Sequence, residues 1–186
     1  MNKTTYRKDS KATGVLNYRL GSKDISYPLQ HRYGSHLPLL LDVLSQCNIK
    51  SVLEIGLGEC STPILASLGT IEIVEQGEVS TFSPAFVEWG QKEFPHAKIH
   101  IALGKDSWRE LPLADHYDLV FIDGYEYSRV DIANWAADHA DVIILHDTEP
   151  EAVCYGWDRL NIPWYRYDYT DFIPNATVFS RKPLNL

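Results

Sequence analysis

The chain has 186 residues, of which 45% are hydrophobic and 23% charged, and this composition is typical of one globular domain rather than a disordered or fibrous chain. The longest apolar runs, such as 142–145, are about five residues or shorter, far below the roughly 20 that cross a bilayer. The formal net charge of −8 argues against a general nucleic-acid binder, because a phosphate backbone favours a basic surface. We therefore expect a soluble protein with no membrane partner and no nucleic-acid partner.

The first 35 residues differ in charge from the rest. Residues 1–24 carry six basic and two acidic side chains, and the segment is interpreted as part of a basic N-terminal tail or lid that spans 1–35. No apolar stretch follows the first basic residues, so neither a secretory signal nor an anchor is predicted. Cys47, Cys60 and Cys154 lack the spacing of metal ligands, and reduced thiols are expected. These features predict a cytoplasmic protein.

From about residue 36 onward, helical and strand patterns alternate. Helical patterns are expected over 37–44, from Ser61-Thr62-Pro63 to Gly69, from Ser83-Pro84 to Pro95, and across Ile132, Trp135, Ala136 and His139. Strands are expected at Ser51–Ile55, Thr70–Val74, Lys98–Ala102, Asp118–Ile122 and Asp141–Leu145. The alternation predicts an α/β fold with a doubly wound, mostly parallel sheet and helices on both of its faces.

The C-terminal part predicts one more helix and an antiparallel hairpin. Thr148-Glu149-Pro150-Glu151 matches a capping box, and the helix after it would bury Val153, Trp157 and Leu160. The last two strands, near 163–169 and Thr177–Ser180, are joined by a loop too short for a helix, so they should be antiparallel. In doubly wound sheets ligands bind at the carboxyl ends of the strands, and we look for the site there.

A glycine turn follows the first parallel strand. Glu54-Ile55-Gly56-Leu57-Gly58 contains two glycines, which allow backbone to approach a ligand closely. Glu75 lies 19 residues beyond Gly56, at the end of the next strand, where a carboxylate can accept both hydroxyls of a ribose. Together the two features predict a nucleoside ligand.

The pattern resembles the first motif of class I, Rossmann-like S-adenosylmethionine-dependent methyltransferases, over about residues 36–180. The resemblance implies that residues 36–186 form a domain that binds S-adenosylmethionine. It implies cofactor contacts from Glu54, Gly56, Gly58, Ser61, Glu75, Asp106, Ser107, Trp108 and Asp123. For Trp108 and Ser107 a core tryptophan and a helix cap are the alternative. Cys60-Ser61 stands in the region where dinucleotide enzymes have a third glycine, which weighs against a nicotinamide-linked oxidoreductase.

Two carboxylates follow neighbouring predicted strands, and hard divalent cations prefer oxygen ligands. Asp123 and Asp147 match the acids that hold magnesium in small-molecule O-methyltransferases, so the resemblance implies Mg²⁺ as a second cofactor. Thr148 stands where catechol enzymes have an amide ligand, and His146 stands where macrolide enzymes have an acid. On either template the metal site is incomplete.

The candidate catalytic residues are Glu126, Asp123 and His146. Glu126 is three residues beyond Asp123, a position from which related O-methyltransferases supply a base. A carboxylate can act as a base when burial raises its pKa. The alternatives are an exposed loop acid for Glu126 and a merely hydrogen-bonded histidine for His146.

The sequence thus predicts methyl transfer from S-adenosylmethionine to an oxygen, or in second place a nitrogen, of a small-molecule acceptor. A homo-oligomer is left open. One alternative is a non-catalytic nucleotide-binding protein of the same fold. Another is an RNA or other nucleic-acid methyltransferase, which the basic tail favours and the acidic remainder of the chain opposes.

Overall fold

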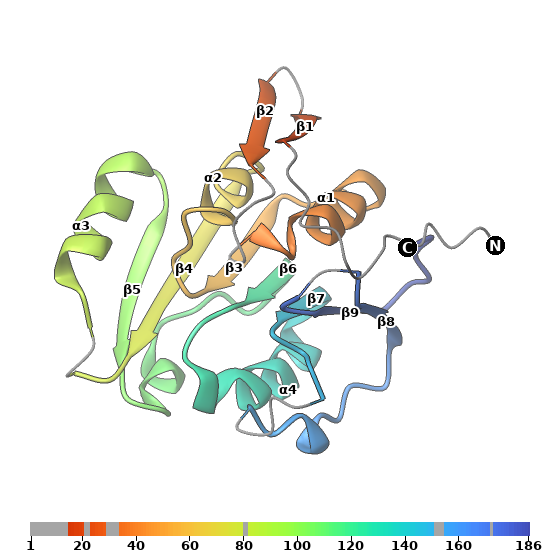
Figure 1. Ribbon diagram of the computed structural model, residues 1–186. Helices are drawn as coiled ribbons and strands as arrows, with labels where there is room; N and C mark the ends of the chain where they lie inside the picture. The colour runs from red at the N-terminus through yellow and green to blue at the C-terminus, as the bar shows by residue number, and fades with distance from the viewer. Residues whose placement is uncertain (1–14, 21–22, 29–33, 80–81, 151–154, 172) are drawn as a thin grey trace.

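The computed structural model describes residues 15–20, 23–28, 34–79, 82–150, 155–171 and 173–186. A seven-stranded sheet has the order β5-β4-β3-β6-β7-β9-β8 (Figure 1). Its strands are β3 (Ser51–Ile55), β4 (Thr70–Gly77), β5 (Lys98–Leu103), β6 (Tyr117–Ile122), β7 (Ala140–His146), β8 (Tyr165–Tyr169) and β9 (Ala176–Ser180). Strands β3 to β7 are parallel, whereas β9 is antiparallel to both β7 and β8. The predicted α/β sheet with its C-terminal hairpin is confirmed.

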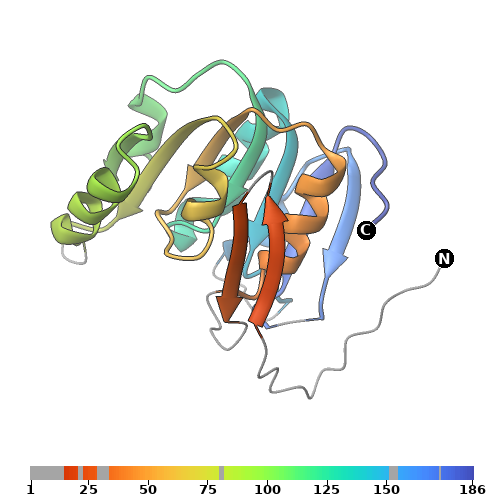
Figure 2. The ribbon, with the colours of Figure 1, turned by 90° about the horizontal axis from the view of Figure 1, so that it is seen from above.

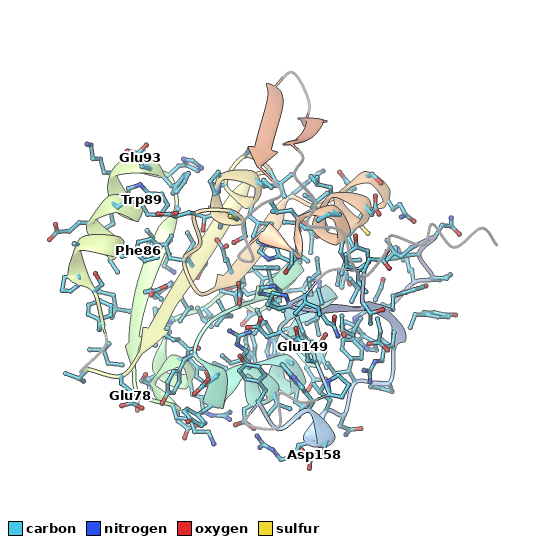
Figure 3. All side chains as sticks on the ribbon, in the orientation of Figure 1. Glu78, Phe86, Trp89, Glu93, Glu149 and Asp158 are labelled. Atoms are coloured by element: carbon cyan, nitrogen blue, oxygen red, sulfur yellow. The ribbon has the colours of Figure 1, made fainter. Side chains whose placement is uncertain are left out.

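Helices cover both faces of this sheet. They are α1 (Leu37–Gln46), α2 (Thr62–Leu65), α3 (Pro84–Glu93) and α4 (Arg129–His139), with the 3₁₀ turns η2 (Ser107–Glu110), η3 (Glu126–Ser128) and η5 (Trp157–Arg159). Helices α1, α2 and α3 lie on the face opposite α4 (Figure 2). The aromatic pair of α3, Phe86 and Trp89, is labelled in Figure 3 and packs on the α1 side.

Strand periodicity explains the two cores. Side chains alternate between the faces of a strand, so Val52 packs beneath α1 and α2 while Leu53 packs on the α4 side. In β6, Phe121 and Ile122 divide in the same way. The almost wholly apolar β3 and β6 are therefore central strands buried on both faces.

The helix predicted after the capping box is not formed where the structure describes it. Residues 147–150 carry no helix, η5 is a single 3₁₀ turn, and Val153 lies outside the described residues. Glu149, labelled in Figure 3, accepts a hydrogen bond from the Asn175 amide (2.7 Å), and Thr148 is hydrogen-bonded to Thr177 (2.9 Å). Both residues are thus held by the C-terminal hairpin instead of capping a helix.

Helix α2 is shorter than predicted, and its expected cap has another partner. Ser61 itself has helical dihedral angles, and its hydroxyl makes no cap hydrogen bond. It donates instead to the buried carboxylate of Glu54 (2.5 Å). The helix ends at Leu65, well before Gly69.

An antiparallel hairpin precedes the large sheet. It consists of β1 (Val15–Leu20) and β2 (Lys23–Pro28), which form a separate two-stranded sheet near α1 and α2 (Figures 1 and 2). The sequence interpretation as a tail or lid had no strands here, and residues 1–14 lie outside the described part. None of the described helices has the length and apolar character needed to span a bilayer.

Candidate functional site at the carboxyl ends of β3, β6 and β7

The turns after β3 and β6 lie against each other. Gly56 has a φ of 93°, and a Cβ there would lie 2.6 Å from the carbonyl oxygen of Asp123. The Asp123 amide donates to the Ile55 carbonyl (2.8 Å), and the Gly56 amide donates to Val74 (2.8 Å). The need for glycine at position 56 therefore arises from close contact between two turns of the protein itself.

Glu54, on β3, is linked to the glycine turn by hydrogen bonds. Its side chain is fully buried, and its two carboxylate oxygens accept hydrogen bonds from Ser61 Oγ (2.5 Å) and Thr62 Oγ1 (2.8 Å). Thr62 Oγ1 in turn accepts from the Gly58 amide (2.9 Å). Burial raises the pKa of Glu54 to about 8; the two hydroxyls oppose this shift, and the charges of Asp123 and Glu75 add to it. Glu54, Gly58 and Ser61, predicted as cofactor contacts, are joined within the turn.

Glu75 reaches the same turn from β4. Its Oε2 accepts a hydrogen bond from the Leu57 amide (2.7 Å), and the side chain is partly exposed. Burial raises its pKa, against the opposing effect of that amide. Among the described residues no hydrogen bond is formed to Oε1. The structure thus brings together the carboxylate and the glycine turn that the sequence singled out.

The predicted adenine contacts after β5 have local partners. Trp108 is 2% exposed and packs against Trp135, with 5.5 Å between ring centroids. The ring is thus packed in the core on the α4 side, which agrees with the alternative of a core tryptophan. Ser107 Oγ donates to the Gly104 carbonyl (2.9 Å), and Asp106 pairs with Arg109 (3.2 Å). For Asp106 and Ser107 the prediction is neither supported nor excluded by these contacts.

Asp123 and Asp147 converge as expected, but a guanidinium group lies between them. Arg129, in the first turn of α4, lies 2.8 Å from Asp147 Oδ2 and 3.2 Å from Asp123 Oδ1, and its side chain is 7% exposed. It also donates to the carbonyls of Gly124 (2.8 Å) and His146 (3.0 Å). The guanidinium already bridges the two carboxylates, so this donor set does not fit the Mg²⁺ expected at Asp123 and Asp147.

Sequence reasoning missed Arg129, although one signal was present. A basic residue in the first turn of a helix faces the positive end of the helix dipole, which is unfavourable, so its presence there indicates that acidic side chains lie nearby. Arg129 is six residues beyond Asp123 and follows a strand-end carboxylate.

Asp123 also contacts His146, the last residue of β7. The His146 Nδ1 atom lies 3.0 Å from Asp123 Oδ1, and both residues are close to buried His36. Burial alone would raise the pKa of Asp123, but the bond and charge of His146 and the charge of Arg129 outweigh it and hold the pKa below its usual range. Asp123 is therefore ionised at neutral pH.

Glu126 does not join this cluster. It begins η3 and is partly exposed, and among the described residues it forms no hydrogen bond or ion pair with Asp123, His146 or Arg129. The neighbouring Tyr125 hydroxyl donates to Glu78. Of the three predicted catalytic residues, the structure brings Asp123 and His146 together and leaves Glu126 on the adjoining turn.

Comparison with known proteins supports the fold. No family model matches the sequence, and no curated protein matches it. Several solved structures share the fold. A candidate O-methyltransferase from Klebsiella pneumoniae is 16% identical, with 88% of this chain and 84% of that one covered and a TM-score of 0.57. A candidate caffeoyl-CoA O-methyltransferase from Staphylococcus aureus is 12% identical, with 78% and 82% covered and a TM-score of 0.58.

A third similar structure was solved with its ligand bound. A candidate methyltransferase from Streptococcus mutans, solved in complex with S-adenosylhomocysteine, is 11% identical, with 77% of this chain and 96% of that one covered and a TM-score of 0.55. At these identities the likeness concerns the fold. The chain has the Rossmann-like fold of class I methyltransferases, as the sequence motif predicted.

Proposed function

We propose that the protein transfers a methyl group from S-adenosylmethionine to an oxygen, or in second place a nitrogen, of a small molecule. The observation that carries the proposal is the junction of Glu75 with the glycine turn, where Oε2 accepts from the Leu57 amide (2.7 Å). This junction lies at the carboxyl ends of β3 and β4, beside the point where the strand order reverses, which is where such sheets bind ligands. The shared fold supports the same reading.

Methyl transfer needs few groups from the protein. The acceptor atom attacks the methyl carbon in line, the carbon–sulfur bond breaks, and the sulfonium leaves as a neutral thioether. The acceptor also loses a proton, for which we propose Glu126 as the base. Binding both molecules in line contributes most of the rate. Asp123, ionised at neutral pH, adds negative charge that favours a cationic donor. No step uses Mg²⁺, because Arg129 bridges its expected ligands.

Calorimetry with S-adenosylmethionine and S-adenosylhomocysteine tests the cofactor. Replacing Glu75 with glutamine removes a charged acceptor of ribose hydroxyls, and hydrogen bonds to charged groups contribute about 1.5–3 kcal/mol. We expect Glu75→Gln to weaken binding about 10- to 100-fold. Glu93→Gln, on exposed α3, is the matched control and should bind like the unmodified protein. Absent binding, or equal affinity in Glu75→Gln, would contradict the proposal.

A non-catalytic nucleotide-binding protein is the second candidate, favoured by Arg129 at the position expected for a metal. Transfer of a labelled methyl group to a panel of hydroxylated and amino metabolites separates the two. Turnover that falls in Glu126→Gln, while S-adenosylmethionine affinity is kept, supports catalysis with Glu126 as base. Binding without turnover across the panel supports the second candidate.

A further inference from the structure

His36 is a buried histidine whose ring nitrogens have no hydrogen bond. It directly precedes α1 and is 1% exposed, and neither Nδ1 nor Nε2 finds a partner among the described residues. Burial disfavours the charged form of the ring, and a neutral imidazole carries a lone pair on one of its two nitrogens. A buried polar atom without a partner is costly, and this one calls for a ligand that the protein itself does not supply.

The hydrogen bonds of Ser35 place a proton on Nε2 of His146. The Ser35 hydroxyl has one proton, which it donates to the Pro174 carbonyl (2.9 Å). The 2.8 Å contact between Ser35 Oγ and His146 Nε2 therefore has Nε2–H as its donor. The other nitrogen, Nδ1, faces Asp123 Oδ1 at 3.0 Å. At this distance either a second ring proton or a metal ion must lie between the two atoms, since their lone pairs would otherwise repel each other.

We propose that His36, His146 and Asp123 form a site for a transition-metal dication, with two imidazole nitrogens and one carboxylate oxygen as ligands. The three ligand atoms lie within 4.8 Å of one another, and the two imidazole rings are 4.7 Å apart between centroids. They come from the start of α1 and from the ends of β7 and β6, three segments distant in the sequence. The buried unpartnered His36 is the observation that distinguishes this cluster from an ordinary ion pair.

The geometry needs a small closure. Metal–nitrogen and metal–oxygen bonds are about 2.0–2.2 Å, so two ligand atoms of a tetrahedral ion are about 3.4 Å apart. A movement of up to about 1.5 Å brings the ligand atoms to that separation. His36 can make this movement because no hydrogen bond among the described residues holds its ring. The ring is held only by packing against rings such as Phe121, 4.8 Å away between centroids.

The surroundings match those of known metal ligands. A metal-bound histidine usually donates its other N–H to an oxygen, which fixes its tautomer, and Ser35 accepts in this way from His146. Arg129 holds the carboxylate of Asp123 (3.2 Å), as partners outside the ligand set commonly do. With neutral imidazoles, Asp123 and Asp147 outweigh Arg129 by one negative charge, which favours a dication.

The ligand types select the metal. Imidazole suits Zn²⁺, Co²⁺, Ni²⁺ and Fe²⁺, and two histidines with one carboxylate leave open positions for water or a substrate oxygen. Mg²⁺ prefers oxygen ligands and is a poor match. The inference differs from the magnesium site at Asp123 and Asp147 in both its ligands and its metal, and it does not depend on methyl transfer.

Metal titration of the full-length protein, without any S-adenosylmethionine, tests the site. After removal of bound metal with a chelator, Zn²⁺ and Mg²⁺ are titrated by calorimetry and Co²⁺ by its visible absorption. We expect one equivalent of Zn²⁺ or Co²⁺ to bind at least about 100-fold more tightly than Mg²⁺. X-ray absorption of the zinc-loaded protein should show two imidazole ligands, a result that needs no variant.

Variants identify the ligands. His36→Phe keeps a ring in the core and His36→Gln keeps a polar group, and each should weaken Zn²⁺ binding at least about 100-fold. His116→Ala, an exposed histidine at the amino end of β6, should bind zinc like the unmodified protein. Circular dichroism verifies that each variant is folded. The proposal fails if the unmodified protein binds no Zn²⁺ or Co²⁺, if Mg²⁺ binds as tightly, or if folded His36 variants bind unchanged. It fails equally if x-ray absorption shows fewer than two imidazoles.

Discussion

Two glycines with positive φ differ in what surrounds them. A Cβ at Gly56 would lie 2.6 Å from the Asp123 carbonyl oxygen, whereas a Cβ at Gly104, with a φ of 100°, would meet nothing within 4 Å. Gly56→Ala therefore adds a backbone clash to the conformational strain that both substitutions share.

We expect Gly56→Ala to lower the free energy of unfolding by roughly 3 kcal/mol or more and Gly104→Ala by about 1 kcal/mol. Urea denaturation measures both losses. Equal losses would mean that the turn after β6 can move away from Gly56 at little cost.

Glu54 predicts a pH dependence of stability. Its pKa is about 8 in the folded protein and near the model-peptide value of 4.5 in the unfolded chain. The folded state therefore binds this proton more tightly, and the stabilisation that results is complete below about pH 4.5 and is lost as the pH rises toward 8.

Replacing Glu54 with glutamine removes that titration while keeping a polar group beside Ser61 and Thr62. Relative to Glu54→Gln, the unmodified protein should lose stability between pH 5 and pH 8.5, at about 1.4 kcal/mol for each unit of pKa difference as an upper bound. Urea denaturation across this range measures the difference. A difference that stays constant with pH would show that Glu54 is ionised throughout.

At the scale of elements, α4 is tied to β6 and β7 by one arginine. Arg129 contacts both Asp123 and Asp147, and removing it would leave two partly buried carboxylates next to each other. Losing one partner of a buried ion pair costs about 3–5 kcal/mol, and the partial exposure of the two acids reduces that figure.

Arg129→Met should therefore destabilise the protein by roughly 2–4 kcal/mol. Arg166→Met, which removes the exposed pair with Asp168 (2.9 Å), is the control and should cost less than about 1 kcal/mol. Thermal and urea denaturation of both variants give the comparison. A small effect at Arg129 would indicate that water solvates the two acids after its removal.

The sequence predicted those elements whose pattern is local. The apolar strands Ser51–Ile55 and Tyr117–Ile122 and the helix over Arg129–His139 were found because their periodicity is carried by consecutive residues. The helix predicted after Thr148 is not formed in its described residues, because the polar partners of its capping box come from the distant hairpin. Contacts between distant segments have no local signal.

The same distinction applies to the site. The link between Glu75 and the glycine turn could be predicted because both positions follow strands at a characteristic spacing. The contact between His36 and His146 could not be predicted, because His36 precedes α1 and lies 110 residues before His146 in the sequence. The core packing of Trp108 was one of two open interpretations, which only the three-dimensional arrangement separates.

In the whole molecule, the acidic side chains of the candidate site gather at one edge of a sheet that is buried on both faces. The turns after β3 and β6 and the ends of β4 and β7 meet there, and they bring Glu75, Asp123 and Asp147 into one region. Arg129 offsets part of this negative charge. Such a region attracts a cationic ligand or a metal and repels a polyanion.

This charge distribution predicts weak RNA binding. The chain has a net charge of −8 although residues 1–24 are basic, and a phosphate backbone would have to approach an acidic protein. We expect fluorescence anisotropy to show no binding of single-stranded or hairpin RNA at about 150 mM salt, where counterion release already favours dissociation. A version lacking residues 1–14 separates the contribution of the basic segment, and at low salt it should bind RNA more weakly still. Tight binding with a steep salt dependence would contradict the prediction and favour an RNA methyltransferase instead.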